Sequence, residues 1–139
     1  MSRSGYTDHD DFDLEGILRY GRWRGVVASS IRGKRGQALL KELAEAMDAM
    51  PKKELIAHVL ESNGQYCTLG VVGAKRGLNL KEIDPEDSAF VASTFNIAEP
   101  LAREIVYMND EYSSSDTPEE RWTRMRKWVQ DQIKDSHDT

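Results

Sequence analysis

The apolar residues of this chain recur every three or four positions, which is the repeat of one face of an α-helix. Residues 37–49, QALLKELAEAMDA, show this spacing, and Trp122, Met125 and Val129 repeat it near the end of the chain. No stretch alternates between apolar and polar residues as a half-buried β-strand would. We therefore expect an all-α fold, a single compact bundle of about six helices.

Capping residues mark where several of these helices begin and end. Asp84-Pro85 and Thr117-Pro118 each predict a helix start, because Asp and Thr cap a helix and Pro fits its first turn. Pro51 ends the helix before it, and Asn63-Gly64 predicts a turn. The apolar segments expected to be helical are 13–31, 37–49, 54–60, 66–75, 89–95, 99–109 and 117–133.

The first of these segments contains glycines at positions 16, 21 and 25. Each glycine costs a helix about 1 kcal/mol relative to alanine. They either mark an interruption at residues 20–22 or let another backbone approach closely. Gly33 and Gly36 bracket Lys34-Arg35 and predict a turn after this segment.

Composition indicates one domain with an acidic character. The 139 residues include 19 Lys and Arg against 24 Asp and Glu, a net charge of -5, which argues against a general nucleic-acid binder. We expect a flexible acidic N-terminus at 1–11, one α-helical domain at 12–134 and a frayed tail at 135–139. There is no apolar run near the roughly 20 residues of a membrane span and no signal-peptide core, so we expect a cytoplasmic protein.

The charge is distributed unevenly, because residues 19–41 carry seven cations and no acidic residue. This basic stretch has three possible roles. It can be a solvated helix face that pairs with the protein's own acids, with Trp23 in the core. It can instead be a protein-binding surface or a nucleic-acid surface. Trp and Arg are common at interface hot spots, so the predicted partner-binding residues are Arg19, Arg22, Trp23, Arg24, Arg32, Lys34 and Arg35.

Residues 86–109 resemble the helix-turn-helix of bacterial and phage regulators. Small Ala92 would let two helices approach, and Asn96 would form the turn. In this arrangement Glu99 and Arg103 are possible DNA-binding residues of the second helix. That helix is nevertheless acidic, which suits it poorly to lie against phosphates.

Signals for catalysis or metal binding are weak. The sequence has no P-loop, GxGxxG, GxSxG or HExxH motif, and its histidines have no metal-ligand spacing with Cys67 or with one another. Cys67 lies in an apolar segment and is expected to be a small core residue. We expect a protein that is not an enzyme and that needs no cofactor or metal.

Five segments cover most of the chain: WRGVVASSIRGKRGQALLKELAEAMDAMP (23–51), CTLGVVGAKRGLNL (67–80), DPED (84–87), FNIAEPLAREIVYMNDE (95–111) and TPEERWTRMRKWV (117–129). Through these segments the chain resembles a family of small phage and prophage accessory proteins, which has no established activity. Small, acidic, helical phage proteins often bind a host protein, and inhibitors of host defence such as anti-CRISPR proteins are a large such group. The resemblance implies a phage-encoded protein that inhibits a host protein or ribonucleoprotein, such as a CRISPR-Cas complex. The alternative is a small helix-turn-helix regulator of phage or prophage genes. Either would be a monomer or homodimer.

Overall fold

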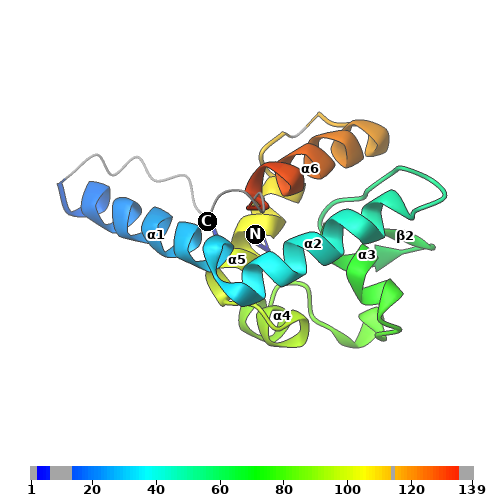
Figure 1. The fold of residues 1–139 in the computed structure, drawn as a ribbon, viewed down its shortest axis with the longest axis horizontal. Helices are drawn as coiled ribbons and strands as arrows, with labels where there is room; N and C mark the ends of the chain where they lie inside the picture. The colour runs from blue at the N-terminus through cyan, green and yellow to red at the C-terminus, as the bar shows by residue number, and fades with distance from the viewer. Residues whose placement is uncertain (1–2, 7–13, 114, 135–139) are drawn as a thin grey trace.

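The computed structural model describes residues 3–6, 14–113 and 115–134, and in these ranges the chain forms six α-helices and one short hairpin (Figure 1). The predicted all-α fold class is confirmed. None of the helices in the described ranges combines the length and the apolar character that a membrane span requires. The elements are α1 (Leu14–Arg32), α2 (Lys34–Asp48), β1 (Glu61–Ser62), β2 (Gln65–Tyr66), α3 (Thr68–Lys75), the 3-10 turn η1 (Leu80–Glu82), α4 (Ser88–Phe95), α5 (Glu99–Asp110) and α6 (Pro118–Gln132).

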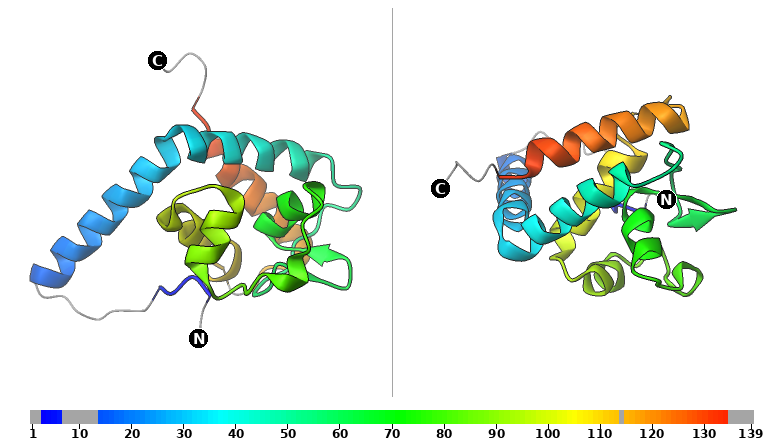
Figure 2. Two further views of the ribbon diagram at one scale, coloured as in Figure 1. Left: turned by 90° about the horizontal axis from the view of Figure 1, so that it is seen from below. Right: turned by 45° about the vertical axis from the view of Figure 1, so that its right-hand side comes forward.

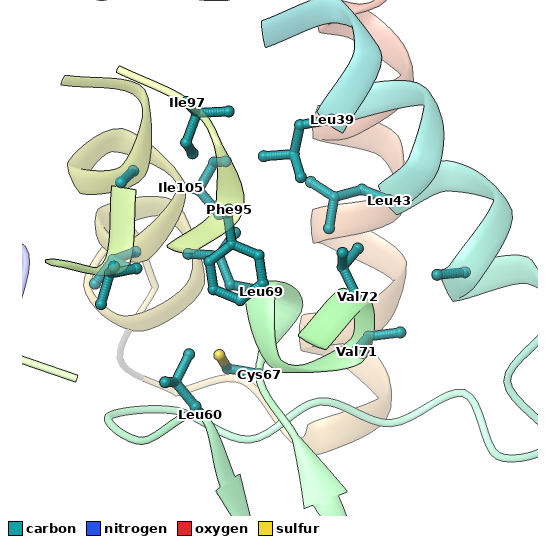
Figure 3. Packing of buried hydrophobic residues seen from close by; sticks show 14 of the residues in the cluster. Leu39, Leu43, Leu60, Cys67, Leu69, Val71, Val72, Phe95, Ile97 and Ile105 are labelled. Atoms are coloured by element: carbon teal, nitrogen blue, oxygen red, sulfur yellow. The ribbon is translucent and has the colours of Figure 1, made fainter. Parts of the chain in front are cut away.

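Helix α5 lies at the centre of the bundle and contacts α1, α3, α4 and α6. Helix α2 packs against α3 and α6 and contributes Leu39 and Leu43 to the core (Figure 3). Phe95 at the end of α4 and Ile105 of α5 meet them from the other side. The apolar residues that repeat every three or four positions in α2 and α5 therefore face one shared interior, as their spacing predicts, whereas those of α1 are mostly exposed.

Helices α1 and α2 meet at a corner at Gly33, and α1 extends away from the bundle (Figure 2). The predicted interruption of α1 at residues 20–22 is wrong, because the helix is continuous from Leu14 to Arg32. The predicted turn is shorter than expected, since Gly36 lies in the first turn of α2. A Cβ atom at Gly36 would overlap the carbonyl oxygen of Ser30, so the glycine lets α2 approach the end of α1.

Residues 54–60 are not helical, which corrects the expectation of a helix there. Their backbone groups bond to distant segments instead. The amide of Leu55 donates to the carbonyl of Pro118 at 3.0 Å, and the amide of Ile56 donates to the carbonyl of Tyr66 at 3.0 Å. These long-range bonds satisfy the backbone amides without a helix and override the local helix preference.

The predicted turn at Asn63-Gly64 is confirmed as the tip of the β1–β2 hairpin. Both residues have positive φ, 52° and 78°, which is the backbone of the two-residue turns that join antiparallel strands. The hairpin is only two residue pairs long. A strand this short shows no alternation in sequence.

The helix-turn-helix-like pair has the predicted order. Asn96 ends α4 in the left-handed conformation, with φ 57° and ψ 49°, and Ala92 is buried where α4 meets α5. The start of α4 lies later than expected, because Asp87 caps it while Asp84 accepts from the amide of Glu86 in the preceding turn. Thr117 begins α6 with the predicted cap.

Residues 3–6 pack against α5, although the sequence predicted a flexible segment at 1–11. Arg3 and Ser4 are buried, and Arg3 donates two hydrogen bonds to Asp110 at the end of α5. The rest of that predicted segment, and the predicted frayed tail at 135–139, lie outside the described residues.

Candidate binding surface

The predicted partner-binding residues separate into two groups, because α1 turns one side toward α5. Trp23 and Arg24 face inward and are half-buried. The remaining five are exposed. These are Arg19, Arg22, Arg32, Lys34 and Arg35.

Arg24 joins α1 to α5 through a bidentate ion pair with Glu104. Its two terminal nitrogens lie 2.7 and 2.9 Å from the carboxylate oxygens, and the Glu104 side chain is only 6% exposed. The hydrogen bond to Glu104 raises the pKa of Arg24, and this outweighs the opposing effect of its partial burial. The Tyr6 hydroxyl donates to the same carboxylate at 2.9 Å. Arg24 is therefore occupied inside the fold, as the self-paired interpretation of the basic stretch predicts for this residue.

Trp23 packs in an aromatic cluster rather than standing free on the surface. Its ring meets Tyr6 edge-on at 5.7 Å, and its indole N–H donates to the Tyr6 hydroxyl at 3.2 Å. The guanidinium of Arg103 lies 4.8 Å from the Trp23 ring centroid, a cation–π contact. Trp23 thus helps to hold α1 and the N-terminal residues on α5.

The two possible DNA-binding residues lie on a helix that is covered by the rest of the fold. Every residue of α5 is buried or half-buried. Arg103 donates to the carbonyl of Ser4 at 2.7 Å and stacks on Trp23, while Glu99 lies half-buried in the first turn. A recognition helix needs one side free to enter a groove of DNA, so this arrangement argues against α5 in that role.

Three of the five exposed cations border a groove of about 730 Å³ at the corner between α1 and α2. Arg22 borders it on α1, and Lys34 and Arg35 border it on α2. The groove itself is lined mainly by small and apolar residues. The other lining residues are Gly25, Val26, Ser29, Ser30, Gly33, Gly36 and Ala98. Arg32 lies at the same corner, and Arg19 lies further along α1 toward its N-terminus; neither lines the groove.

Arg22, Arg32 and Lys34 have no acidic side chain within ion-pair distance among the residues that the structure describes. Arg35 contacts the side-chain oxygen of Asn96 at 3.5 Å. Cations exposed in this way keep their charge available for an external partner. The arrangement can therefore attract an anionic group to a groove that also offers apolar contact.

A buried polar network at the far end of α5 was not predicted from the sequence. Arg3 holds Asp110 at 2.5 and 2.8 Å, and the amide of His58 donates to the same carboxylate at 3.0 Å. Burial alone would raise the pKa of Asp110, but the hydrogen bonds and charge of Arg3, helped by those from His58 and Asn109, hold it below its ordinary value. Nothing in the sequence near Arg3 indicates so distant a partner.

Cys67 is buried and caps α3, where its sulfur accepts a hydrogen bond from the amide of Gly70 at 3.4 Å. The prediction that Cys67 is a core residue is confirmed.

Across the described ranges, no three His, Cys, Asp or Glu side chains gather in a way that could hold a metal ion. The groove bordered by Arg22, Lys34 and Arg35 combines exposed cations with an apolar lining, and it is the candidate binding site. Comparison of the chain with known proteins finds no matching family model, no matching curated protein and no matching solved structure.

Proposed function

We propose that this chain is a phage-encoded, non-enzymatic binding protein that uses its basic groove to occupy an acidic site on a host protein or ribonucleoprotein. A bacterial defence complex such as a CRISPR-Cas effector is a partner of this kind. The observation that carries the proposal is the group of exposed cations at the corner of α1 and α2. They stand on a chain whose net charge is -5.

The charge distribution favours a protein or ribonucleoprotein over free nucleic acid. Outside residues 19–41 the chain has 12 basic and 24 acidic residues, and this excess repels an extended phosphate backbone. A small acidic site on a folded partner would contact only the exposed cations at the corner of α1 and α2, and not the acidic remainder of the surface. The same acidic excess could compete for grooves in which a host protein holds nucleic acid.

The groove adds apolar contact to the charge. Interfaces between proteins combine an apolar centre with a polar rim in which Arg is common. Val26 is 48% exposed beside Arg22, and Ala98 closes the groove from α5. A phosphate backbone has no apolar group to place in this groove, whereas an apolar side chain of a protein partner can fill it.

The test is affinity capture from a bacterial host lysate, with matched variants. Arg32→Glu/Lys34→Glu reverses the charge of two exposed residues at the corner of α1 and α2. Lys75→Glu/Lys81→Glu makes the same change in net charge on exposed residues elsewhere. We expect wild type and the Lys75/Lys81 control to retain one stoichiometric partner, and the Arg32/Lys34 variant to lose it. Equal capture by all three would refute the proposal.

Nuclease treatment of the lysate separates the two kinds of partner. Capture that survives treatment indicates contact with protein, and capture that is lost indicates contact through the nucleic acid of a ribonucleoprotein. The regulator alternative makes a different prediction. Purified protein would bind specific DNA with an affinity that falls steeply as salt rises, through released counterions. Such binding, without a captured protein partner, would replace the proposed function by DNA regulation.

A further inference from the structure

The N-terminal half of α1 leaves the bundle and exposes large apolar side chains (Figures 1 and 2). Leu14 is 70% exposed, Ile17 56% and Leu18 52%. Within this 19-residue helix, all of it described, Val27 is the one buried residue. Helices in proteins owe most of their stability to packing of an apolar face. Large exposed apolar residues on a projecting helix therefore indicate a contact outside the single chain.

Gly21 and Gly25 lie near the middle of the same helix, and nothing in the described chain requires either to be glycine. A Cβ atom at either position would meet no other described atom within 4 Å. Gly36 differs, because a Cβ there would overlap Ser30. Residues four apart lie on one face of a helix, so the two glycines make a flat place where another helix can come close.

Side-chain size changes along this face. Leu14 and Leu18 supply large residues in the N-terminal half. Gly25 and Ser29 continue the same face with small ones, and both line the groove at the corner with α2. Two such faces laid parallel would set large residues against large and small against small. Laid antiparallel, the leucines of each copy enter the small-residue half of the other.

We propose that two copies of this chain associate through antiparallel pairing of their α1 helices, which cross near Gly21 and Gly25. Leu14 and Leu18 of each copy fill the groove beside Gly25 and Ser29 of the other. The dimer and the host complex of the proposed function use the same groove, so they are alternative assemblies. The contact is the same on both copies, as a twofold symmetric dimer requires.

The charges at the two ends of α1 support the antiparallel order. Glu15 lies in the first turn of the helix and Arg32 is its last residue. Antiparallel pairing brings the acidic end of each copy toward the basic end of the other, and it also opposes the two helix dipoles favourably. Parallel pairing would instead set Glu15 against Glu15 and Arg32 against Arg32.

Sedimentation velocity of the full chain over a range of concentrations tests the association. We expect wild type to change from monomer to dimer as concentration rises. Gly25→Leu adds a side chain where the single chain has room, so it should keep the fold. It should also raise the dimer Kd by about tenfold or more, by holding the helices apart. Ser93→Leu adds the same side chain at an exposed position of α4 and should leave the Kd unchanged.

A wild type that stays monomeric at every concentration overturns the proposal, and so does a Gly25→Leu variant that dimerises as wild type does. Leu14→Asp/Leu18→Asp changes exposed residues only and gives the same answer if Gly25→Leu fails to fold. The groove test for a host partner changes Arg32 and Lys34. The outcome of one test therefore does not decide the other.

Disulfide cross-linking reports the orientation. A mixture of Leu18→Cys and Gly25→Cys chains should form the mixed 18–25 cross-link under mild oxidation, while Cys67 is buried and does not compete. Cross-links that form mainly within each single variant, 18–18 and 25–25, would refute the antiparallel order.

Discussion

Arg24 of α1 and Glu104 of α5 form a bidentate ion pair, with nitrogen–oxygen distances of 2.7 and 2.9 Å. Arg22, two residues earlier, is exposed on the rim of the groove. Two arginines that look equivalent in the sequence therefore have different roles. One fastens the projecting helix to the bundle, and the other presents charge to solvent.

We expect Arg24→Ala to lower the free energy of unfolding by about 1–2 kcal/mol, because it leaves the carboxylate of Glu104 buried without its cation. The Arg24 side chain is itself 40% exposed, and solvent screening keeps the effect below that of a fully buried pair. Arg22→Ala should change stability by less than about 0.5 kcal/mol. Urea unfolding followed by circular dichroism measures both, and equal losses would contradict the division of roles.

The sequence predicted elements whose cause is local. The helix start predicted at Thr117 needs only Glu120 three residues later, and in the structure the two residues bond reciprocally. Asn96 needs only tolerance of positive φ to end α4. The fold class followed from such signals together with the helical repeat.

Features with distant causes could not be predicted in this way. Residues 54–60 have an apolar pattern that suits a helix, but their backbone bonds to Pro118 and Tyr66. Arg3 finds Asp110 more than a hundred residues away. The rotation of α1 about its own axis decides which of its arginines contacts Glu104. The amino-acid composition does not specify this rotation. The groove was likewise missed, because it exists only where α1 and α2 meet.

Trp23→Ala should destabilise the fold by about 1–3 kcal/mol. The change removes the edge contact with Tyr6, the hydrogen bond to its hydroxyl and the stacking partner of Arg103. Trp23→Phe keeps a ring for both contacts but cannot donate the hydrogen bond, so it should lose less. Thermal unfolding followed by far-ultraviolet circular dichroism, which reports helix content, compares the stabilities of the variants. A Trp23→Ala protein as stable as wild type would place Trp23 outside the structural core.

Gly36→Ala and Gly25→Ala should shift stability in opposite directions. The new methyl group at Gly36 overlaps the Ser30 carbonyl and forces α1 and α2 apart, at a cost of about 1–3 kcal/mol. At Gly25 the methyl group has room, and the helix gains up to about 1 kcal/mol from the better helix former. Denaturant midpoints at one low protein concentration, where association is minimal, measure both effects. A stabilised Gly36→Ala protein would show that the corner is not closely packed.

Asp110 should make the protein less stable as the pH falls through the acidic range. An unfolded Asp has a pKa of about 3.9, and Arg3, with His58 and Asn109, holds the pKa of folded Asp110 lower. The unfolded chain therefore binds a proton first, so the stability from this pair is present above the unfolded value. It is lost as the pH falls toward the folded one. Glu42, Asp48 and Asp116, whose pKa values are also lowered, add to the same trend.

Asp110→Asn should remove the contribution of this one residue. At neutral pH it leaves Arg3 as a buried cation without its carboxylate, which costs about 3–5 kcal/mol. Below the ordinary carboxyl pKa the difference from wild type should shrink, because wild-type Asp110 is then protonated too. Urea unfolding over a series of pH values measures this convergence, with the exposed Glu45→Gln as the control for loss of one negative charge. A difference that stays constant across the acidic range would show that the Arg3–Asp110 pair does not set the pH dependence.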